Sequence, residues 1–367
     1  MRGAIDSQVG LLTLTTPEKR VPEKHPIRQI KRIADDALKG INTRLNEMYA
    51  GGGRPSIPPE RLLKAQLLIA LYSVRSERQF CERLNYDLLF RYFLDMNLDD
   101  ATWDASTFAK NRERLVFHEI AQHFFEEVVR AAKRANLMSQ EHFTVDGTLI
   151  EAWASLKSFR PKGERKEDRE PPDDPGNPSV NFRGKKRKND THESTTDPES
   201  KLATKGNGQT AKMSYSGHVL MENRNGLCVD FRIVPPSGHA ERNEALKMIR
   251  RLRRRAFDPK TVAGDRGYDV GSFPKDLLDL GIKPHVAVNE HRPPNSLSRR
   301  YARGKGYEVS QRIRKRVEEI FGWMKTFGGL RKTRYRGTAR TATAGYFVAT
   351  AYNLLRMGRL LGRAADA

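Results

Sequence analysis

The chain has 367 residues, and its 67 Lys and Arg outnumber 45 Asp and Glu, so the formal net charge is +22 and the pI is about 10.1. Basic residues recur along the whole chain, which favours a polyanionic partner, most often nucleic acid. Cys81 and Cys228 are the only cysteines, which argues against a disulfide framework or a structural zinc site. No stretch approaches the roughly 18 apolar residues of a membrane helix, so we expect a cytoplasmic protein without a membrane partner.

The first 137 residues are predicted to form an all-α domain, since amphipathic patterns follow one another at short intervals. Ser76, with Gln79 three residues later, is a capping-box signal, and Asp104 precedes another helix that continues through Lys110, Arg112 and Arg114. Short helices that end in a cationic one indicate a helix-turn-helix arrangement, with the second helix in the DNA major groove. Short helical bundles without any DNA-binding role show the same pattern, so this alternative stays open.

From residue 138 the pattern is α/β. Residues 143–150 alternate and predict a strand that carries Asp146, whereas residues 158 to about 210 hold few apolar residues and are typical of a flexible insertion. The order of the predicted strands and helices is β-β-β-α-β-α-β-α, which indicates a mixed sheet flanked by helices. The predicted elements are strands at 143–150, 213–220, 227–234, 261–265 and 285–288, and helices at 240–254, 272–280, 307–327 and 344–361.

The segment 307–327 predicts one helix with an apolar face and a second, charged stripe. Arg314, Glu318 and Lys325 share that stripe, and Glu319 points the other way. A stripe of this kind is also typical of a solvated helix surface. The helix alone therefore leaves the role of Glu318 open.

Asp146 lies within the first predicted strand, and Asp265 ends the fourth. If these strands are neighbours, their carboxylates face each other at the edge of the sheet where ligands gather, and Glu318 can complete the cluster. Such hard oxygen ligands suit Mg²⁺ or Mn²⁺, with two ions about 3.5–4 Å apart, and permit in-line phosphoryl transfer. Aspartates at strand ends also serve as turn caps, which is the alternative interpretation.

Three blocks together resemble the signature of bacterial insertion-sequence DDE transposases, in the insertion-sequence-five-like group with a Tyr-Arg-Glu-Lys motif. The blocks are Val145-Asp146-Gly147-Thr148, Ala263-Gly264-Asp265-Arg266-Gly267-Tyr268 and Arg314-x3-Glu318-x6-Lys325. The resemblance implies an RNase H-like catalytic domain at 138–367 behind a DNA-binding domain at 1–137. It also implies a nucleoid-associated enzyme that binds double-stranded DNA, at transposon ends and target, as a homodimer or larger assembly.

By this resemblance Asp146, Asp265 and Glu318 are the catalytic, metal-binding triad, and Mg²⁺ or Mn²⁺ is the cofactor. Arg314 and Lys325 would contact the transposon end or orient the glutamate. Gln311 stands where the family has tyrosine, which leaves the positioning of the DNA end open. The remaining candidate DNA contacts are Arg266, Lys110, Arg112 and Arg114.

We therefore expect a transposase that binds the terminal inverted repeats of an insertion sequence, cleaves its ends and transfers the 3′-hydroxyl to target DNA. Two alternatives share parts of this pattern. A catalytically silent, transposase-derived DNA-binding regulator would keep the basic surface. An unrelated RNase H-like nuclease would share the carboxylates but lack the helical N-terminal domain and the charged stripe.

Overall fold

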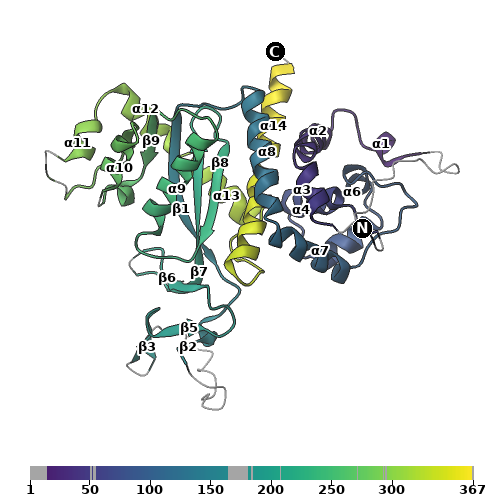
Figure 1. The fold of residues 1–367 in the computed structure, drawn as a ribbon, viewed down its shortest axis with the longest axis horizontal. Coiled ribbons are helices and arrows are strands. Elements are labelled where there is room, and N and C mark those ends of the chain that lie inside the picture. Colours follow the sequence, from purple (N-terminus) through teal and green to yellow (C-terminus); the bar gives the residue numbers. More distant parts are fainter. Residues whose placement is uncertain are drawn as a thin grey trace. The chain divides into compact units, whose positions relative to one another are not determined.

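The computed structural model describes residues 15–49, 52, 55–163, 181–182, 185–206, 208–270, 272–291, 293 and 296–365. The chain forms two compact units (Figure 1). The first comprises Met1–Met138, Thr326–Gly329 and Tyr346–Ala367, and the second Ser139–Lys325 and Leu330–Gly345. The predicted boundary near residue 137 therefore marks only the first point at which the chain passes from one unit to the other. The C-terminal part of the last helix belongs to the first unit again.

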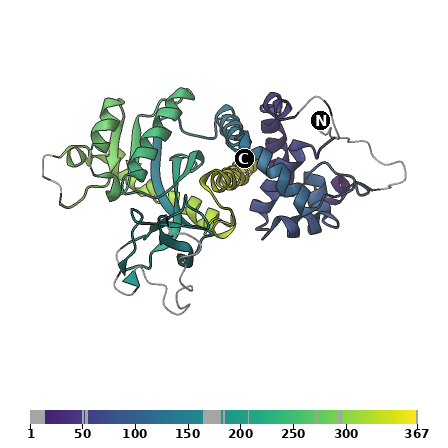
Figure 2. The same ribbon diagram turned by 60° about the horizontal axis from the view of Figure 1, so that its bottom comes forward.

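The first unit is all-helical in its described residues (Figure 2), and several of its phenylalanines are buried in its interior. Phe80 stacks on both Phe90 and Phe108, with ring centroids 5.5 and 5.7 Å apart. Phe125 packs against Tyr346 at 5.7 Å, which holds the C-terminal part of α14 in this unit. Its helices are α1 (Pro17–Arg20), α2 (Pro26–Lys39), α3 (Asn42–Glu47), α4 (Pro59–Leu71), α5 (Glu77–Leu84), α6 (Leu88–Phe93), α7 (Ala105–Phe117), α8 (Ile120–Arg134) and most of α14 (Thr338–Ala365).

Both predicted helix caps of this unit are confirmed. The Ser76 hydroxyl accepts a hydrogen bond from the Gln79 N–H at the start of α5. Asp104 accepts from the N–H groups of Ser106 and Thr107 at the start of α7. Each cap satisfies backbone donors that the first helical turn leaves without an intrahelical partner.

A buried ammonium joins helices α4 and α2 of the first unit to the turn that follows α6. Lys64, on α4, is 1% exposed and pairs with Asp35, at 2.9 Å, and with Asp95. Lys31 pairs with the same two carboxylates, at 2.6 and 2.7 Å. Burial works to raise the pKa of Asp95, but Lys64 and Lys31 outweigh it and hold that pKa below its ordinary value. Two cations therefore share two carboxylates, and loss of either cation leaves charge uncompensated.

The second unit is built on a mixed sheet, as its sequence pattern predicts. The strand order is β10-β9-β1-β7-β6, with β8 also paired to β7. β1 runs antiparallel to β7 and parallel to β9, and β9 is parallel to β10. The strands of this sheet are β1 (His142–Glu151), β6 (Lys201–Ala203), β7 (Lys212–Glu222), β8 (Cys228–Val234), β9 (Thr261–Gly264) and β10 (Lys283–Val286).

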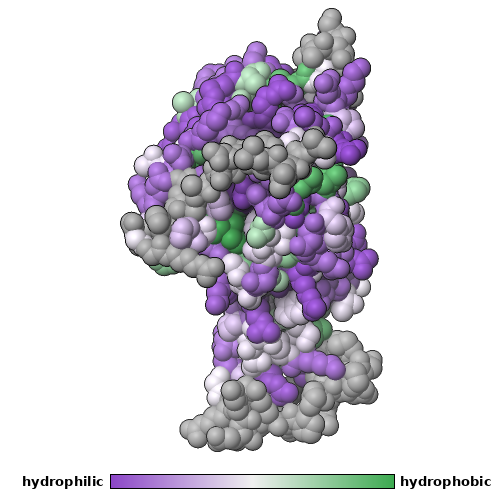
Figure 3. Space-filling view, turned by 90° about the vertical axis from the view of Figure 1, so that its right-hand side faces the viewer, coloured by the Kyte–Doolittle hydropathy of each residue, from purple (hydrophilic) through white to green (hydrophobic). Residues whose placement is uncertain are grey.

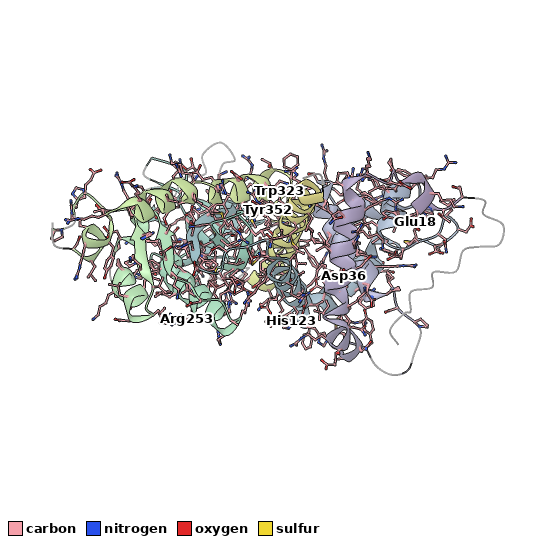
Figure 4. All side chains as sticks on the ribbon, turned by 90° about the horizontal axis from the view of Figure 1, so that it is seen from above. Glu18, Asp36, His123, Arg253, Trp323 and Tyr352 are labelled. Atoms are coloured by element: carbon pink, nitrogen blue, oxygen red, sulfur yellow. The ribbon has the colours of Figure 1, made fainter. Side chains whose placement is uncertain are left out.

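Helices of the second unit flank this sheet (Figure 1). The longest described helix that lies entirely within the unit, α9 (Ala240–Arg254), packs on β7 and β8, where Arg251 donates two hydrogen bonds to the buried Asp230. Arg253, labelled in Figure 4, donates from its C-terminal end to the Leu280 carbonyl. The other helical segments are η1 (Leu156–Ser158), η3 (Arg266–Tyr268), α10 (Phe273–Asp279), α11 (Leu297–Tyr301), α12 (Lys305–Arg314), α13 (Val317–Thr326) and the first part of α14.

The interpretation of residues 158–210 as one flexible insertion requires correction. β2 (Phe159–Pro161) pairs with β5 (His192–Ser194), and β3 (Asn181–Phe182) pairs with β4 (Lys185–Lys186). Asp197 is buried and accepts hydrogen bonds from the Tyr215 hydroxyl, at 2.7 and 2.8 Å, and from the Gly337 N–H. Single polar contacts order this segment without an apolar pattern, so composition does not detect them. Residues 164–180, 183–184 and 207 of the predicted insertion lie outside the described residues.

The expectation of one helix over 307–327 is wrong. α12 ends at Arg314 and α13 begins at Val317, and three-residue turns join them: the Arg316 N–H donates to the Ile313 carbonyl, and the Glu318 N–H to that of Lys315. The apolar face of α13 is buried separately from the contacts that hold α12 on β9 and β10. The two segments are therefore anchored independently, and one helical wheel does not describe both.

The face of the molecule in Figure 3 is largely hydrophilic, with hydrophobic residues in small separate patches. Within the described residues, no helix combines the length and apolar character that crossing a membrane requires.

Lys64→Met tests the buried ion network. Because the substitution leaves Asp35 and Asp95 facing each other without the ammonium, we expect a loss of about 3 kcal/mol in the free energy of unfolding at pH 7. The pKa of Asp95 in the folded state lies below its ordinary value of 3.8, so the ionised Asp95 stabilises the fold above pH 3.8. This stabilisation is lost as the pH falls through the folded-state pKa. The difference in stability between wild type and Lys64→Met should therefore narrow at low pH. Urea unfolding at several pH values measures both effects.

Lys39→Met is the matched control. The Lys39–Asp36 pair lies on α2, the helix that also carries Asp35, but it is exposed, and exposed ion pairs contribute little to stability. An equal loss in both variants would contradict the assigned role of Lys64.

Candidate active site

Asp146 and Asp265 lie just beyond the last residue pair of two neighbouring parallel strands. The pairing of β1 with β9 ends at Thr144 opposite Ala263, and each aspartate follows two residues later. Because side chains alternate along extended chain, each aspartate lies on the same face as the residue two positions before it. Asp265 itself has extended backbone angles, φ −77° and ψ −176°. The expected adjacency of the two strands is confirmed.

Burial raises the pKa of Asp146 to about 7. A hydrogen bond from the Gly147 N–H, 2.8 Å from Oδ1, opposes the shift. The charges of Asp265 and Glu241 raise the pKa further, and Arg314 lowers it. Asp146 is therefore a shielded carboxyl group with two acidic neighbours and one cationic neighbour, a combination that is concentrated at functional sites.

Asp265 is held by the turn that follows β9. Its Oδ1 accepts a hydrogen bond from the Gly267 N–H at 2.9 Å and so caps η3. A Cβ on Gly267 would lie 3.0 Å from that oxygen, so a larger residue there would crowd the carboxylate. Tyr268 is buried beneath the turn, against Gly264. The Asp-Arg-Gly-Tyr sequence thus fixes the Asp265 carboxylate at the end of the strand.

Glu241, which our sequence analysis missed, is the third acidic side chain near this pair. It lies in the first turn of α9, and its Oε1 is 3.0 Å from the position that a Cβ of Gly147 would take. Partial burial and the charge of Asp265 raise its pKa. The available signal was Gly147 itself, since a glycine inside a strand often marks a close approach by another group. An acidic residue in a first helical turn is otherwise explained by the helix dipole.

Glu318 is exposed in the first turn of α13. Within the described part of the chain, no hydrogen bond or ion pair engages its side chain, and no three Asp, Glu, His or Cys side chains already form a group that would hold a metal ion. The proposed completion of the cluster by Glu318 therefore stays a prediction. Asp146 and Asp265 are the two expected triad members whose charges interact in the structure.

Arg314 and Lys325 both lie close to the strand that carries Asp146. Arg314 donates from Nε to the side-chain oxygen of Gln311 at 3.1 Å, and its charge acts on Asp146. Lys325 donates to the Thr148 hydroxyl at 2.5 Å, and Thr148 lies on the same face of β1 as Asp146. Burial lowers the pKa of Lys325, and the nearby Lys205 and Arg331 lower it further. These cations therefore lie beside the strand of Asp146, from which they are separated in sequence by more than 150 residues.

The other candidate DNA contacts differ in how free their side chains are. Arg266 is 67% exposed and pairs at 2.9 Å with Glu290, which is also on the surface; such a pair contributes little to stability and leaves the guanidinium accessible. Arg112 is only 16% exposed and pairs with Glu77, so the structure gives it a role inside the first unit instead. Lys110 is exposed, and the exposed Arg114 lies over the Tyr49 ring, 4.7 Å from its centroid. A basic helix stripe does not reveal the acidic partner of Arg112, which lies 35 residues earlier in the chain.

The carboxylates of this site are chemically suited to bind a divalent cation, although no three of them converge on one point within the described residues. Asp146, Asp265 and Glu241 supply hard oxygen donors of the kind that Mg²⁺ and Mn²⁺ prefer. Burial raises the pKa of Asp146 and of Glu241, and the charge of Asp265 raises both further. A bound cation would relieve this repulsion. The shielded Asp146–Asp265 pair is the centre of this candidate site.

Comparison with known proteins gives two family matches and several distant structural similarities. The solved structures include the piggyBac transposase synaptic complex with hairpin DNA (12% identity, 91% of this chain and 75% of that chain, TM-score 0.41). They also include the Mos1 transposase paired-end complex with left transposon end (12%, 80% and 87%, TM-score 0.20) and the Mos1 mariner paired end complex with Mn (12%, 92% and 97%, TM-score 0.21). At these TM-scores the similarities do not contribute to the assignment.

The two family matches together span most of the chain. The model described as Transposase domain (DUF772) matches residues 15–114. The model described as Transposase DDE domain matches residues 139–354, more than half of the chain, and includes Asp146, Asp265 and Glu318. The chain therefore belongs to the Transposase DDE domain family, whose members are DNA-cleaving and DNA-transferring enzymes that use divalent metal ions.

Proposed function

We propose that this transposase is catalytically active, with Asp146 and Asp265 as the carboxylates that bind the divalent cation. The observation that carries the proposal is their equal offset beyond the last β1–β9 pair. This offset brings two acidic side chains to one edge of the sheet, where burial raises the pKa of Asp146 to about 7. The substrates are the terminal inverted repeats of the mobile element and a target DNA, joined by phosphoryl transfer to a 3′-hydroxyl.

The chain's own residues would position the reacting groups. Asp146 and Asp265 would hold Mg²⁺ or Mn²⁺, as one of two ions, and when bound the metal supplies positive charge at the reacting phosphate. Lys325, at Thr148, and Arg314, beside Asp146, add fixed cations that attract the DNA backbone to this edge. Oriented charges that surround the phosphate before reaction lower the barrier without reorganisation.

Two glutamates compete for the third acidic position. Glu318 has the place that the family resemblance gives to the third ligand, and like Glu241 it is exposed. Glu241 lies against Gly147, next to Asp146, and interacts with Asp265. We include Glu241 in the cluster as a contributor of negative charge, while Glu318 would join the cluster when DNA and metal bind.

DNA recognition would use the first unit, in which Lys110 and Arg114 on α7 are exposed. Pairing of two element ends requires at least two copies of the chain, so we propose a homodimer or larger assembly during the reaction.

Asp146→Asn and Asp265→Asn test the catalytic assignment. Each should lower Mn²⁺-dependent cleavage of a duplex taken from the DNA that flanks the coding sequence by at least about 1,000-fold, because each removes a carboxylate that holds the metal. End binding, measured by gel shift, should persist. Glu319→Gln is the control and should cleave normally. Wild-type protein that binds the ends without cleaving them would instead identify a silent regulator.

The two glutamates are separated by a binding measurement. Glu241→Gln should weaken Mn²⁺ binding by about tenfold in the absence of DNA, because it removes negative charge near the pair. Glu318→Gln should leave this binding unchanged but abolish cleavage. Unchanged Mn²⁺ affinity in Glu241→Gln would remove Glu241 from the cluster.

Asp146→Asn should also stabilise the metal-free protein. A carboxyl group with a pKa of about 7 in the folded state and an ordinary value of 3.8 destabilises the fold wherever it is ionised. The penalty begins above pH 3.8, grows up to about pH 7 and then levels off. After allowance for partial solvent screening, we expect a gain of about 1–3 kcal/mol at pH 8 in EDTA that disappears near pH 4. Urea unfolding measures it, and a pH-independent gain would contradict the shifted pKa.

Lys110→Gln combined with Arg114→Gln should weaken end binding and lower the slope of log affinity against log salt by about 2. Arg112→Gln should instead lower the unfolding temperature, because it leaves Glu77 without its partner. Fluorescence anisotropy across salt concentrations measures the slope, and an unchanged slope in the double variant would place end recognition elsewhere.

A further inference from the structure

Gln311 lies where α12 crosses the ends of two parallel strands. Its side-chain nitrogen donates to the His285 carbonyl of β10 and, at 3.4 Å, to the Gly264 carbonyl of β9. Gly264 directly precedes Asp265 in the chain. The amide therefore joins the helix to the backbone that carries one of the two central carboxylates.

The other end of the same amide reaches Arg314. The Gln311 oxygen accepts from Arg314 Nε at 3.1 Å, one helical turn along α12. Both donor positions of the Gln311 nitrogen have protein partners, and its oxygen accepts from the arginine. A side chain committed in this way acts within the protein, which argues against the direct DNA contact expected from the sequence.

Arg314 is the cation that acts on Asp146. An arginine side chain has about 2 kcal/mol of rotamer entropy to lose when it is held in one place. The hydrogen bond at Nε restrains the guanidinium but leaves its two terminal nitrogens available. Gln311 therefore links the strand end at Asp265 to a cation beside Asp146.

We propose that Gln311 is a positioning residue that fixes the Arg314 guanidinium relative to Asp146 and Asp265 for the transfer reaction. This inference rests on the proposed function, in which the two aspartates act at the reacting phosphate. A fixed cation at this position stabilises charge that develops on the phosphate, whereas a mobile one must be ordered during the reaction.

The neighbouring Ser310 supplies a matched control. Its hydroxyl hydrogen-bonds to His285 Nδ1 at 2.7 Å, so it also ties α12 to β10 through a buried contact. The Ser310 contact does not involve Arg314. If Gln311 merely holds α12 in place, loss of either contact should have a similar effect on cleavage.

The experiment is a double-mutant cycle in the full chain, with Mn²⁺ and a duplex taken from the DNA flanking the coding sequence. The variants are Gln311→Met, Arg314→Gln, their combination, Ser310→Ala and Asp146→Asn. Single-turnover cleavage is measured at saturating protein, and end affinity and thermal unfolding are measured alongside. Gln311→Met keeps the side-chain length and removes both hydrogen-bonding functions.

We expect Gln311→Met to slow cleavage about tenfold with end affinity within about twofold of wild type, and Arg314→Gln to slow cleavage about 100-fold. Combined, they should be no slower than Arg314→Gln alone, because Gln311 acts through Arg314. Ser310→Ala should cleave at nearly the wild-type rate even if its unfolding temperature falls.

Multiplicative effects of the two substitutions, or equal losses in Gln311→Met and Ser310→Ala, would overturn the inference. Asp146→Asn separates this failure from failure of the proposed function. If Asp146→Asn is inactive while Gln311→Met cleaves normally, only the role of Gln311 is wrong. If Asp146→Asn cleaves normally, the proposed site itself is wrong.

Discussion

The parallel pairing between β1 and β9 is the constraint on which this active site depends. It stops at Thr144 and Ala263, so both strands leave the ladder at the same level. Asp146 and Asp265 are each two residues further along, and neither can move away without a shift in strand register. The sheet thus holds two like charges near each other, and the raised pKa of Asp146 reflects that arrangement together with burial.

The groups around this pair show how a sheet edge is adapted to phosphate chemistry. Gly147 leaves room for Glu241, and Gly267 leaves room for the Asp265 carboxylate that it caps. On the cationic side, Arg314 acts on Asp146 and Lys325 is hydrogen-bonded to Thr148. Acidic groups that favour a metal and basic groups that favour the DNA backbone therefore meet at the middle of β1, where its pairing with β9 stops.

The sequence was sufficient for the elements that depend on local pattern. The strand that carries Asp146, the helix at 240–254 and the caps at Ser76 and Asp104 follow from periodicity and hydrogen-bonding chemistry, and the structure confirms them. The sequence was insufficient for features that depend on tertiary contacts. The break between Arg314 and Val317 depends on separate anchoring of two segments.

Three residues make contacts that the sequence did not predict, and for one reason. Arg112 has a distant acidic partner, Gln311 bonds to two strand carbonyls, and Glu241 approaches Gly147 from another element. None of these contacts leaves a periodic signal. A charged or polar residue on a predicted helix therefore cannot be assumed to be exposed, because the sequence does not show which residue of another element packs against it.

The central claim is that Asp146 and Asp265 act as one cation site. Electron paramagnetic resonance of Mn²⁺, titrated into the full chain without DNA, tests it most directly. The account predicts that Asp146→Asn and Asp265→Asn each abolish the same tight binding event, and that the double variant loses no further ion. Retention of wild-type Mn²⁺ binding by either single variant would contradict it.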